Sequence, residues 1–253
     1  VHGSNGEVVY LSDQEKVRIW ETARQAIPSD RSMIAGTGCE STDQTVALSH
    51  QAADVGADAV LVLTPHYYGG QMTASALTRH FRAVADASPV PVVLYNMPRF
   101  TGVDMDARTV TTIAQHPNVV GIKDSGGNTG KLAEIVGSTD SDFQVLAGSA
   151  SFFLPALTVG AVGGVMALAN IAPQPLIDLY NLFKAGKTEE AATLQRRLVP
   201  LNRAVTSQFG IPGLKAALGM LGYYGGPVRS PLKPLADRDA QTLRAILAQG
   251  EVL

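Results

Sequence analysis

The sequence contains a single cysteine, Cys39, among its 253 residues. One thiol cannot form a disulfide framework, and it cannot supply a metal site built from several cysteines. So little cysteine fits a reducing compartment. Cys39 follows a Gly-Thr-Gly turn, and no histidine is suitably placed in the sequence to activate its thiol. We therefore interpret Cys39 as a structural or incidental thiol and not as a nucleophile.

The chain also lacks an excess of charge of either sign and lacks a long apolar run. Its formal net charge is −2, so the sequence shows no basic footprint for nucleic acid. A membrane-spanning helix requires about 18 or more apolar residues without interruption. The most apolar segment, residues 152–170, is interrupted by Pro155 and by glycines. We expect neither a nucleic-acid partner nor a membrane partner.

The sequence also lacks clustered metal ligands. The five histidines are scattered along the chain, and His66, at a predicted strand end, has no second ligand nearby. A catalytic zinc site needs about three protein ligands close together. We therefore expect no metal site and no metal-dependent chemistry.

What the sequence does contain, up to about residue 185, is an alternation of apolar and helical segments. The apolar segments are rich in Val, Ala, Leu and Ile without polar alternation, which is typical of parallel strands buried on both faces. We predict six strands, over residues 33–38, 59–64, 90–96, 119–125, 143–149 and 163–168, with a strand stub at Val1.

The helical segments have recognisable starts and stops. Ser12 and Glu15 form a capping-box pattern at the start of the first helix, and Pro28 follows its end. We predict helices over residues 12–27, 47–55, 73–86, 106–115, 129–136, 152–157 and 173–185. Only helices follow, over residues 187–208, 212–221 and 237–249.

A doubly wound sheet and a TIM barrel both fit this order. We favour an α/β TIM (β/α)8 barrel, because polar residues follow nearly every strand and are not confined to one crevice. Residues 1–185 would form the barrel and residues 186–253 a C-terminal helical extension. The polar residues at strand ends are Ser4, Thr37, Thr64, Tyr67, Tyr95, Lys123, Ser149 and Asn170.

The predicted barrel is short. The fold has eight strands and typically about 250 residues, whereas the alternating pattern ends near residue 185. We expect that this chain lacks the first strand–helix unit and most of the next strand. The natural protein would then have some tens of residues upstream of Val1.

Lys123 is the most informative polar residue, because it ends an apolar strand. A charge there is costly unless it is paired or has a function. A pairing with Asp124 or an exposed position at the rim would explain it structurally. Alternatively, apolar walls make the amine nucleophilic near neutral pH, and such an amine attacks ketones to form a Schiff base.

Tyr95 ends the preceding strand at the equivalent level. A phenol in that position can move protons to and from the carbinolamine and the substrate hydroxyl. The plain alternative is a half-buried aromatic ring with a hydrated hydroxyl group. Tyr67 and Tyr68 either extend a proton relay or shape the rim.

Two glycine-containing segments invite a binding interpretation. Residues 4–6, Ser-Asn-Gly, offer amide groups that can bind a carboxylate or phosphate, although a plain turn also fits. Residues 126–131 resemble a P-loop ending in Lys131. The glycine spacing is one residue short, however, and Leu132 stands where serine or threonine is needed.

Together these motifs resemble the dihydrodipicolinate synthase / N-acetylneuraminate lyase family of Schiff-base TIM-barrel lyases. The segments that carry the resemblance are Gly3–Glu7, Thr64–Tyr68, Tyr95–Pro98 with Thr101–Gly102, Gly121–Ser125, Leu146–Ser149 and Gly163–Asn170.

The resemblance implies roles for individual residues. Lys123 would form the Schiff base with pyruvate, Tyr95 would be the acid/base, and Tyr67 would complete the proton relay across a subunit contact. Ser4 and Asn5 would hold the pyruvate carboxylate. The remaining substrate-binding residues would be Ser125, Gly148 and Val165. The family implies no cofactor beyond the lysine itself, and a homotetramer built as a dimer of dimers.

Within the family the chain is most similar to the 4-hydroxy-2-oxoglutarate aldolases. The Ser4–Asn5 pair, residues 36–42, residues 209–215 and residues 222–227 carry this similarity. Dihydrodipicolinate synthases have an arginine two residues after the proline of the Tyr-Asn-x-Pro motif, where Phe100 stands here, with Arg99 one residue earlier. A phenyl ring cannot bind a carboxylate in a bidentate manner.

The sequence therefore predicts a metal-independent class I aldolase that cleaves 4-hydroxy-2-oxoglutarate to pyruvate and glyoxylate. The alternatives are another pyruvate-dependent lyase, either 4-hydroxy-tetrahydrodipicolinate synthase or a 2-keto-3-deoxy sugar acid aldolase, and a catalytically silent barrel that serves as a binding or scaffold protein. The resemblance implies an intracellular location, which would be the cytoplasm or, in a eukaryote, the mitochondrial matrix.

Overall fold

The computed structural model describes all residues from Val1 to Leu253. They form two compact units. The first comprises Val1–Leu146 with Val159–Val162, and the second comprises Ala147–Thr158 with Gly163–Leu253. No helix combines the length and the apolar character needed to cross a membrane. The predicted division near residue 185 stays a prediction.

The fold is built on a sheet of six strands, and the strands follow one another across the sheet in chain order. The pairings β1–β2, β2–β3 and β3–β4 are all parallel, which confirms the predicted class of α/β fold. The strands are β1 (Ile34–Gly36), β2 (Ala59–Leu63), β3 (Val92–Asn96), β4 (Val119–Asp124), β5 (Gln144–Ala147) and β6 (Gly163–Gly164).

Val1 lies beside β1, as the predicted strand stub requires. Its amino group donates a hydrogen bond to the Ile34 carbonyl at 2.8 Å. The Gly36 amide in turn donates to the Val1 carbonyl at 2.8 Å. These two bonds continue the ladder of the sheet by one residue beyond β1.

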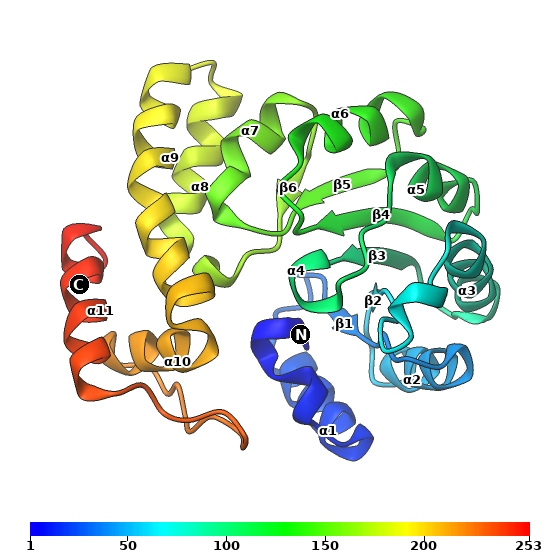
Figure 1. Ribbon diagram of the computed structural model, residues 1–253, viewed down its shortest axis with the longest axis horizontal. Coiled ribbons are helices and arrows are strands. Elements are labelled where there is room, and N and C mark those ends of the chain that lie inside the picture. The colour runs from blue at the N-terminus through cyan, green and yellow to red at the C-terminus, as the bar shows by residue number, and fades with distance from the viewer. The chain divides into compact units, whose positions relative to one another are not determined.

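Except for α4, which follows Met97, the helices of the first unit begin at short polar caps. At α1 the predicted capping box is confirmed: the Glu15 amide donates to Ser12 Oγ, and the Ser12 amide donates to Glu15 Oε2 at 2.9 Å. Helices α2, α3, α5 and α6 run along the outside of the strands (Figure 1). The helices are α1 (Asp13–Ala26), α2 (Thr42–Asp54), α3 (Ala74–Ala87), α4 (Pro98–Thr101), α5 (Ala107–Ala114) and α6 (Thr129–Ser138).

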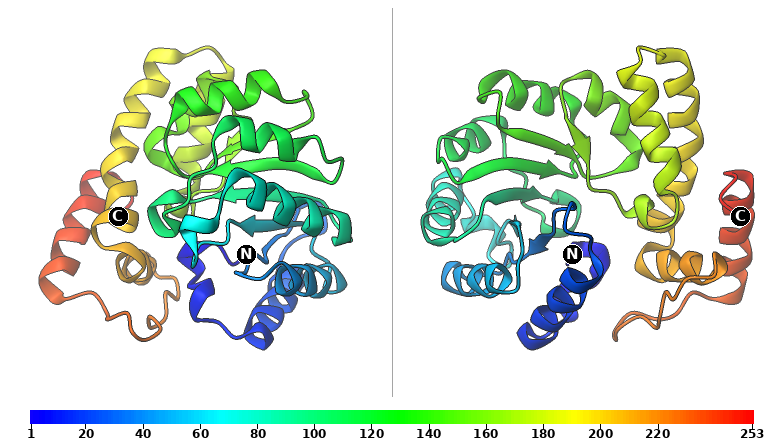
Figure 2. Two further views of the ribbon diagram at one scale, coloured as in Figure 1. Left: turned by 45° about the vertical axis from the view of Figure 1, so that its right-hand side comes forward. Right: turned by 180° about the vertical axis from the view of Figure 1, so that it is seen from behind.

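The second unit is almost entirely helical, as predicted for the last part of the chain. Helices α8 and α9 pack side by side (Figures 1 and 2). The helices are α7 (Phe153–Thr158), α8 (Pro173–Lys184), α9 (Thr188–Arg203), α10 (Gly210–Met220) and α11 (Asp237–Gln249).

Two predicted elements of the second unit have different extents. Strand β6 comprises only two glycines, and the last two residues predicted to continue it, Ala167 and Leu168, begin a 3-10 helix, Ala167–Asn170. The helix predicted over residues 187–208 ends at Arg203. A π-helical turn, Ala204–Gln208, follows and is closed by the bond from the Phe209 amide to the Ala204 carbonyl.

Gly121 is required by the close approach of β4 and β5. A Cβ at Gly121 would lie 2.4 Å from the carbonyl oxygen of Gln144, whereas a Cβ at Gly137 on α6 would meet nothing within 4 Å. We expect Gly121→Ala to lower the free energy of unfolding by about 1–3 kcal/mol. The matched variant Gly137→Ala should raise it by up to about 1 kcal/mol, because alanine favours a helix interior. Urea denaturation measures both, and equal stabilities of the two variants would contradict the assigned strand contact.

Candidate active site

Lys123 and Tyr95 stand side by side at the ends of β4 and β3. The parallel register pairs Tyr95 directly with Lys123, and register partners point to the same face of a sheet. Lys123 Nζ lies 4.0 Å from the centroid of the Tyr95 ring. Both side chains are buried, with 6% of Lys123 and 4% of Tyr95 exposed. The structure therefore brings the predicted amine and the predicted phenol together.

The surroundings of this pair are apolar. Tyr95 packs in a cluster with Leu61 and Val93, and partly buried side chains cover the cluster. A lysine in such surroundings loses hydration, and the face of the Tyr95 ring supplies an electrostatic attraction in its place. The alternative explanation of Lys123, an ion pair with Asp124, is not found. The Asp124 carboxylate binds Lys131, with 2.9 Å between Lys131 Nζ and Asp124 Oδ2.

The predicted Ser-Asn-Gly turn lies next to both groups. It forms a 3-10 turn, Ser4–Gly6, which also contains Asn5. Ser4 Oγ and the Tyr95 hydroxyl oxygen are 3.2 Å apart, and either hydroxyl can be the donor. A Cβ added to Gly3 would lie 3.8 Å from Lys123 Nζ, so the backbone before the turn passes close to the amine. Amine, phenol and turn thus occupy one place in the first unit.

Tyr67 lies in a different setting. Its side chain is exposed, its ring contacts Tyr68 edge to face with centroids 5.0 Å apart, and its amide donates to Glu40 Oε2 at 2.8 Å. Within one chain the ring does not join the hydrogen bond between Ser4 and Tyr95. If Tyr67 takes part in a proton relay, it must therefore do so in the site of a second chain.

The other predicted substrate-binding residues are divided between the two units. Ser125 follows β4, and its amide donates to the Asn96 carbonyl at 2.9 Å. Gly148 and Val165 belong to the second unit, where the Val165 amide donates to the Ala147 carbonyl at 2.9 Å.

The sequence analysis missed the polar residues that directly follow the two candidate catalytic residues. Asn96 follows Tyr95 and Asp124 follows Lys123, and both are completely buried. Asn96 Nδ2 donates to Asp124 Oδ2 at 2.7 Å. The signal was present, because an amide or a carboxylate inside an apolar strand must find a partner.

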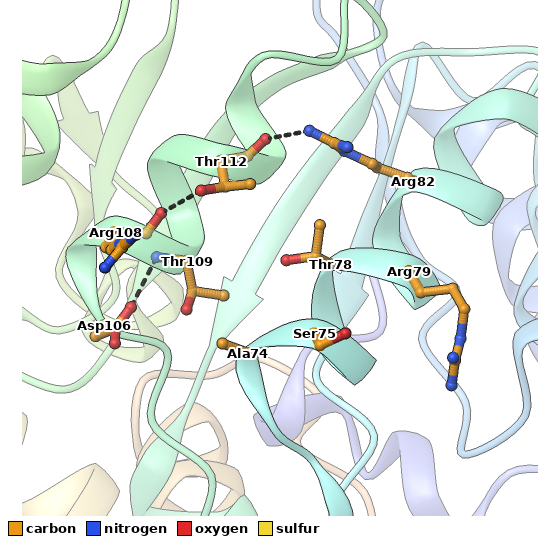
Figure 3. Close-up of a pocket in the computed structure, with 9 residues that line it drawn as sticks. All are labelled: Ala74, Ser75, Thr78, Arg79, Arg82, Asp106, Arg108, Thr109 and Thr112. Atoms are coloured by element: carbon orange, nitrogen blue, oxygen red, sulfur yellow. Dashed lines mark hydrogen bonds between the residues drawn. The ribbon is translucent and has the colours of Figure 1, made fainter.

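A surface groove of the first unit is separate from this site. It has a volume of about 640 Å³ and lies between α3 and α5. In Figure 3, Arg82 donates to the carbonyl of Thr112, while the side chains of Arg79 and Arg108 point away from each other. The arginines therefore do not converge on one ligand position.

No group of three or more histidine, cysteine, aspartate or glutamate side chains is arranged to hold a metal ion. The groups that meet at Tyr95 are the amine of Lys123 and the hydroxyl of Ser4. A buried amine beside a phenol can add to a carbonyl carbon and exchange protons with its oxygen.

Comparison with known proteins places this site in a family. The model of the dihydrodipicolinate synthetase family matches residues 1–250. The 4-hydroxy-tetrahydrodipicolinate synthase of Methanothrix thermoacetophila is 37% identical over 248 residues, which are 98% of this chain and 83% of that protein. A probable mitochondrial 4-hydroxy-2-oxoglutarate aldolase of Emericella nidulans is 37% identical over 255 residues, 99% of this chain and 82% of that protein.

Among solved structures, the chloride-inhibited dihydrodipicolinate synthase of Acinetobacter baumannii complexed with pyruvate superposes with a TM-score of 0.93. It is 31% identical and covers 99% of this chain and 86% of its own. Sequence and fold agree across nearly the whole chain, so this protein belongs to the dihydrodipicolinate synthetase family and is a carbon–carbon lyase.

Proposed function

We propose that this lyase is a Schiff-base aldolase that cleaves 4-hydroxy-2-oxoglutarate to pyruvate and glyoxylate. The observation that carries the proposal is the buried pair in which Lys123 Nζ lies 4.0 Å from the Tyr95 ring centroid. The Ser4–Tyr95 hydrogen bond supports it, because it connects the phenol to the turn that would hold a carboxylate.

In the proposed reaction the neutral amine of Lys123 attacks C2 of the substrate. Tyr95 delivers a proton to the carbonyl oxygen, and the carbinolamine loses water to give an iminium ion. Tyr95 then removes the proton of the 4-hydroxyl group. The C3–C4 bond breaks, glyoxylate leaves, and the electron pair moves into the iminium to form an enamine. Protonation at C3 and hydrolysis release pyruvate and restore the lysine.

The other residues have binding roles in this proposal. Ser4 and Asn5 hold the 1-carboxylate of the 2-oxo acid through the amides and side chains of their turn. Ser125, Gly148 and Val165 contact the substrate further from Lys123. No metal or organic cofactor takes part, because the iminium itself accepts the electrons.

We further propose that the protein is a homotetramer, a dimer of dimers, in which Tyr67 of one chain completes the proton relay of another. The exposure of Tyr67, Tyr68 and Val9, at 77%, 71% and 70%, supports an apolar contact surface there. An intracellular location is part of the same proposal, either the cytoplasm or the mitochondrial matrix. The mitochondrial description of the Emericella nidulans relative supports the second compartment.

The proposal extends to the fold. The six strands would belong to an eight-stranded barrel whose first strand–helix unit lies outside this chain, with residues 1–185 in the barrel and residues 186–253 as its helical extension. The greater length of the relatives supports this interpretation, since the chain covers 83% of the Methanothrix thermoacetophila protein.

The choice of glyoxylate over aspartate semialdehyde rests on Phe100. This side chain is more than half exposed at the end of α4, and the Arg99 guanidinium carbon lies 5.6 Å from its ring centroid. An arginine at position 100 would offer a bidentate contact to the carboxylate of aspartate semialdehyde, which phenylalanine cannot make, so a smaller or differently held acceptor such as glyoxylate fits better. The second candidate for the activity is that of a 4-hydroxy-tetrahydrodipicolinate synthase, because the Methanothrix thermoacetophila relative has that name.

Borohydride reduction in the presence of pyruvate tests the Schiff base. We expect reduction to abolish activity and to add a reduced pyruvate group to the peptide that contains Lys123. Lys123→Arg should lower the turnover number by at least about 10³-fold, because the nucleophile is lost. An active preparation with an unmodified Lys123 would overturn the mechanism, and a chain without activity or adduct would favour the scaffold alternative.

Tyr95→Phe tests the role of the phenol. The variant keeps the ring beside Lys123 but removes the hydroxyl that bonds to Ser4, so we expect a loss of about 10²–10⁴-fold in turnover with an unchanged unfolding midpoint. Tyr223→Phe, at an exposed tyrosine of the second unit, is the control and should keep full activity. Full activity of the Tyr95 variant would show that the phenol moves no proton.

Side-by-side rates with glyoxylate, aspartate semialdehyde and glyceraldehyde as acceptors for pyruvate test the substrate. We expect glyoxylate to give a catalytic efficiency at least about 10-fold above the others, since differences in pocket contacts of this kind typically discriminate acceptors by about that much. We expect Phe100→Arg to raise the catalytic efficiency with aspartate semialdehyde relative to that with glyoxylate. A preference of the unmodified protein for aspartate semialdehyde would establish the synthase activity in place of the aldolase.

A further inference from the structure

A buried polar cluster lies on the face of β3 and β4 that points away from the candidate site. We call Asn96, Asp104, Asp124 and Lys131 the strand-end cluster. Asn96 and Asp124 are register partners, one residue beyond Tyr95 and Lys123. Successive strand residues point to opposite faces, so the cluster and the catalytic pair share two strands but not one face.

The side chains of the cluster bind one another closely. Asn96 Nδ2 donates to Asp104 Oδ1 and to Asp124 Oδ2, both at 2.7 Å. Lys131 Nζ donates to Asp104 Oδ1 at 2.6 Å and contacts Asp124 Oδ2 at 2.9 Å. Asn96 and Asp124 are completely buried, and Lys131 is 8% exposed. Each buried charge therefore has an oppositely charged partner.

The cluster also holds the backbone around it. Asn96 Oδ1 accepts from the Met105 amide at 3.0 Å, which fixes the segment between α4 and α5. Asp124 Oδ1 accepts from the Gly126 amide at 2.8 Å, which fixes the turn after β4. Lys131 stands in the first turn of α6. Three segments around the ends of β3 and β4 are thus joined by side chains and not by the sheet alone.

The strand-end cluster contains more negative than positive charges. Two carboxylates, Asp104 and Asp124, face one ammonium group. Burial alone would lower the pKa of Lys131, but the bonds to Asp104 and the charge of Asp124 outweigh it and raise that pKa. Lys131 therefore stays charged and remains the ion-pair partner of the Asp124 carboxylate.

We propose that the strand-end cluster positions Lys123 and Tyr95 for Schiff-base formation and that Lys131 shields Lys123 from the charge of Asp124. This inference rests on the proposed function of Lys123. Without Lys131, the buried carboxylate of Asp124 would favour the ammonium form of Lys123, which cannot attack a ketone. The members of the cluster are positioning residues, since none of them faces the substrate.

Other titratable groups act on Lys123 in the same place. The phenol of Tyr95 on β3 is in ring contact with it. The Val1 amino group, next to β1, has a pKa lowered first by burial and second by the charge of Lys123. Variants within the strand-end cluster leave both of these groups in place, so a change in the titration of Lys123 reports on the cluster.

The test is the rate of borohydride trapping of pyruvate as a function of pH. Lys131→Met removes the positive charge, and we expect the trapping rate at pH 7 to fall about 10-fold and the midpoint of its pH profile to rise by about 1 unit. Asp104→Asn removes one negative charge from a half-exposed side chain, so its midpoint should fall slightly. Lys131→Arg keeps the charge and should restore most of the rate.

Lys16→Met is the matched control. Lys16 is also 8% exposed and is paired at 3.0 Å with Asp13, which lies on the same helix, α1. We expect its trapping rate and midpoint to equal those of the unmodified protein.

The outcomes separate this inference from the proposed function. An unmodified protein whose Lys123 is not trapped would contradict both. A second outcome would overturn this inference but not the proposed function. In it, Lys123 is trapped with the same pH midpoint in the unmodified protein, in Asp104→Asn and in a folded Lys131→Met variant. If Lys131→Met fails to fold, the direction of the Asp104→Asn shift decides, and a rise or no shift would contradict the shielding role.

Discussion

The structure depends on one constraint, the parallel register that sets Tyr95 of β3 opposite Lys123 of β4. A shift of one residue would turn every side chain of a strand to the other face. Lys123 would then leave the Tyr95 ring, and Asp124 would enter the apolar layer as a charge without its partner. Gly121 contributes to the register, because only a residue without Cβ allows β4 and β5 to approach so closely there.

The two faces of β3 and β4 have opposite characters. On the inner face, apolar side chains and one aromatic ring surround a lysine, and a serine hydroxyl from the turn at residues 4–6 reaches the phenol. On the outer face, Asn96 and Asp124 are held by Lys131 and Asp104. Reactivity on the first face is compatible with stability because the polar groups of the second are fully paired.

Much of this arrangement could be predicted from the sequence. Six apolar runs without polar alternation predicted a buried parallel sheet, and Ser12 with Glu15 predicted the start of α1. Lys123 and Tyr95 were expected together because consecutive parallel strands lie side by side and both residues end their strands. Each of these predictions depends on local pattern and on the order of the strands.

Contacts between side chains from separate segments could not be predicted in this way. Lys131 lies in a segment that resembles a P-loop, and nothing in its spacing indicates that its ammonium group binds Asp104 and Asp124. The shortness of β6 was missed because Val165, Met166 and Leu168 have the apolar character of a buried strand, although only Gly163 and Gly164 form one. Tyr67 cannot be assigned from one chain, since its ring is exposed there.

In the proposed function, specificity for the acceptor depends on a single side chain, that of Phe100. In the same proposal the amine, the phenol and the turn bind the 2-oxo acid. The choice of acceptor is assigned to the exposed ring of Phe100, with Arg99 against it, because phenylalanine cannot make the bidentate carboxylate contact of an arginine.

A crystal structure of the protein soaked with pyruvate is the most direct measurement. Continuous density between Lys123 Nζ and C2 of pyruvate is the predicted result, with the carboxylate within hydrogen-bond distance of Ser4 and Asn5 and the Tyr95 hydroxyl beside C2. Pyruvate bound elsewhere, or joined to a different lysine, would contradict the assignment of the site.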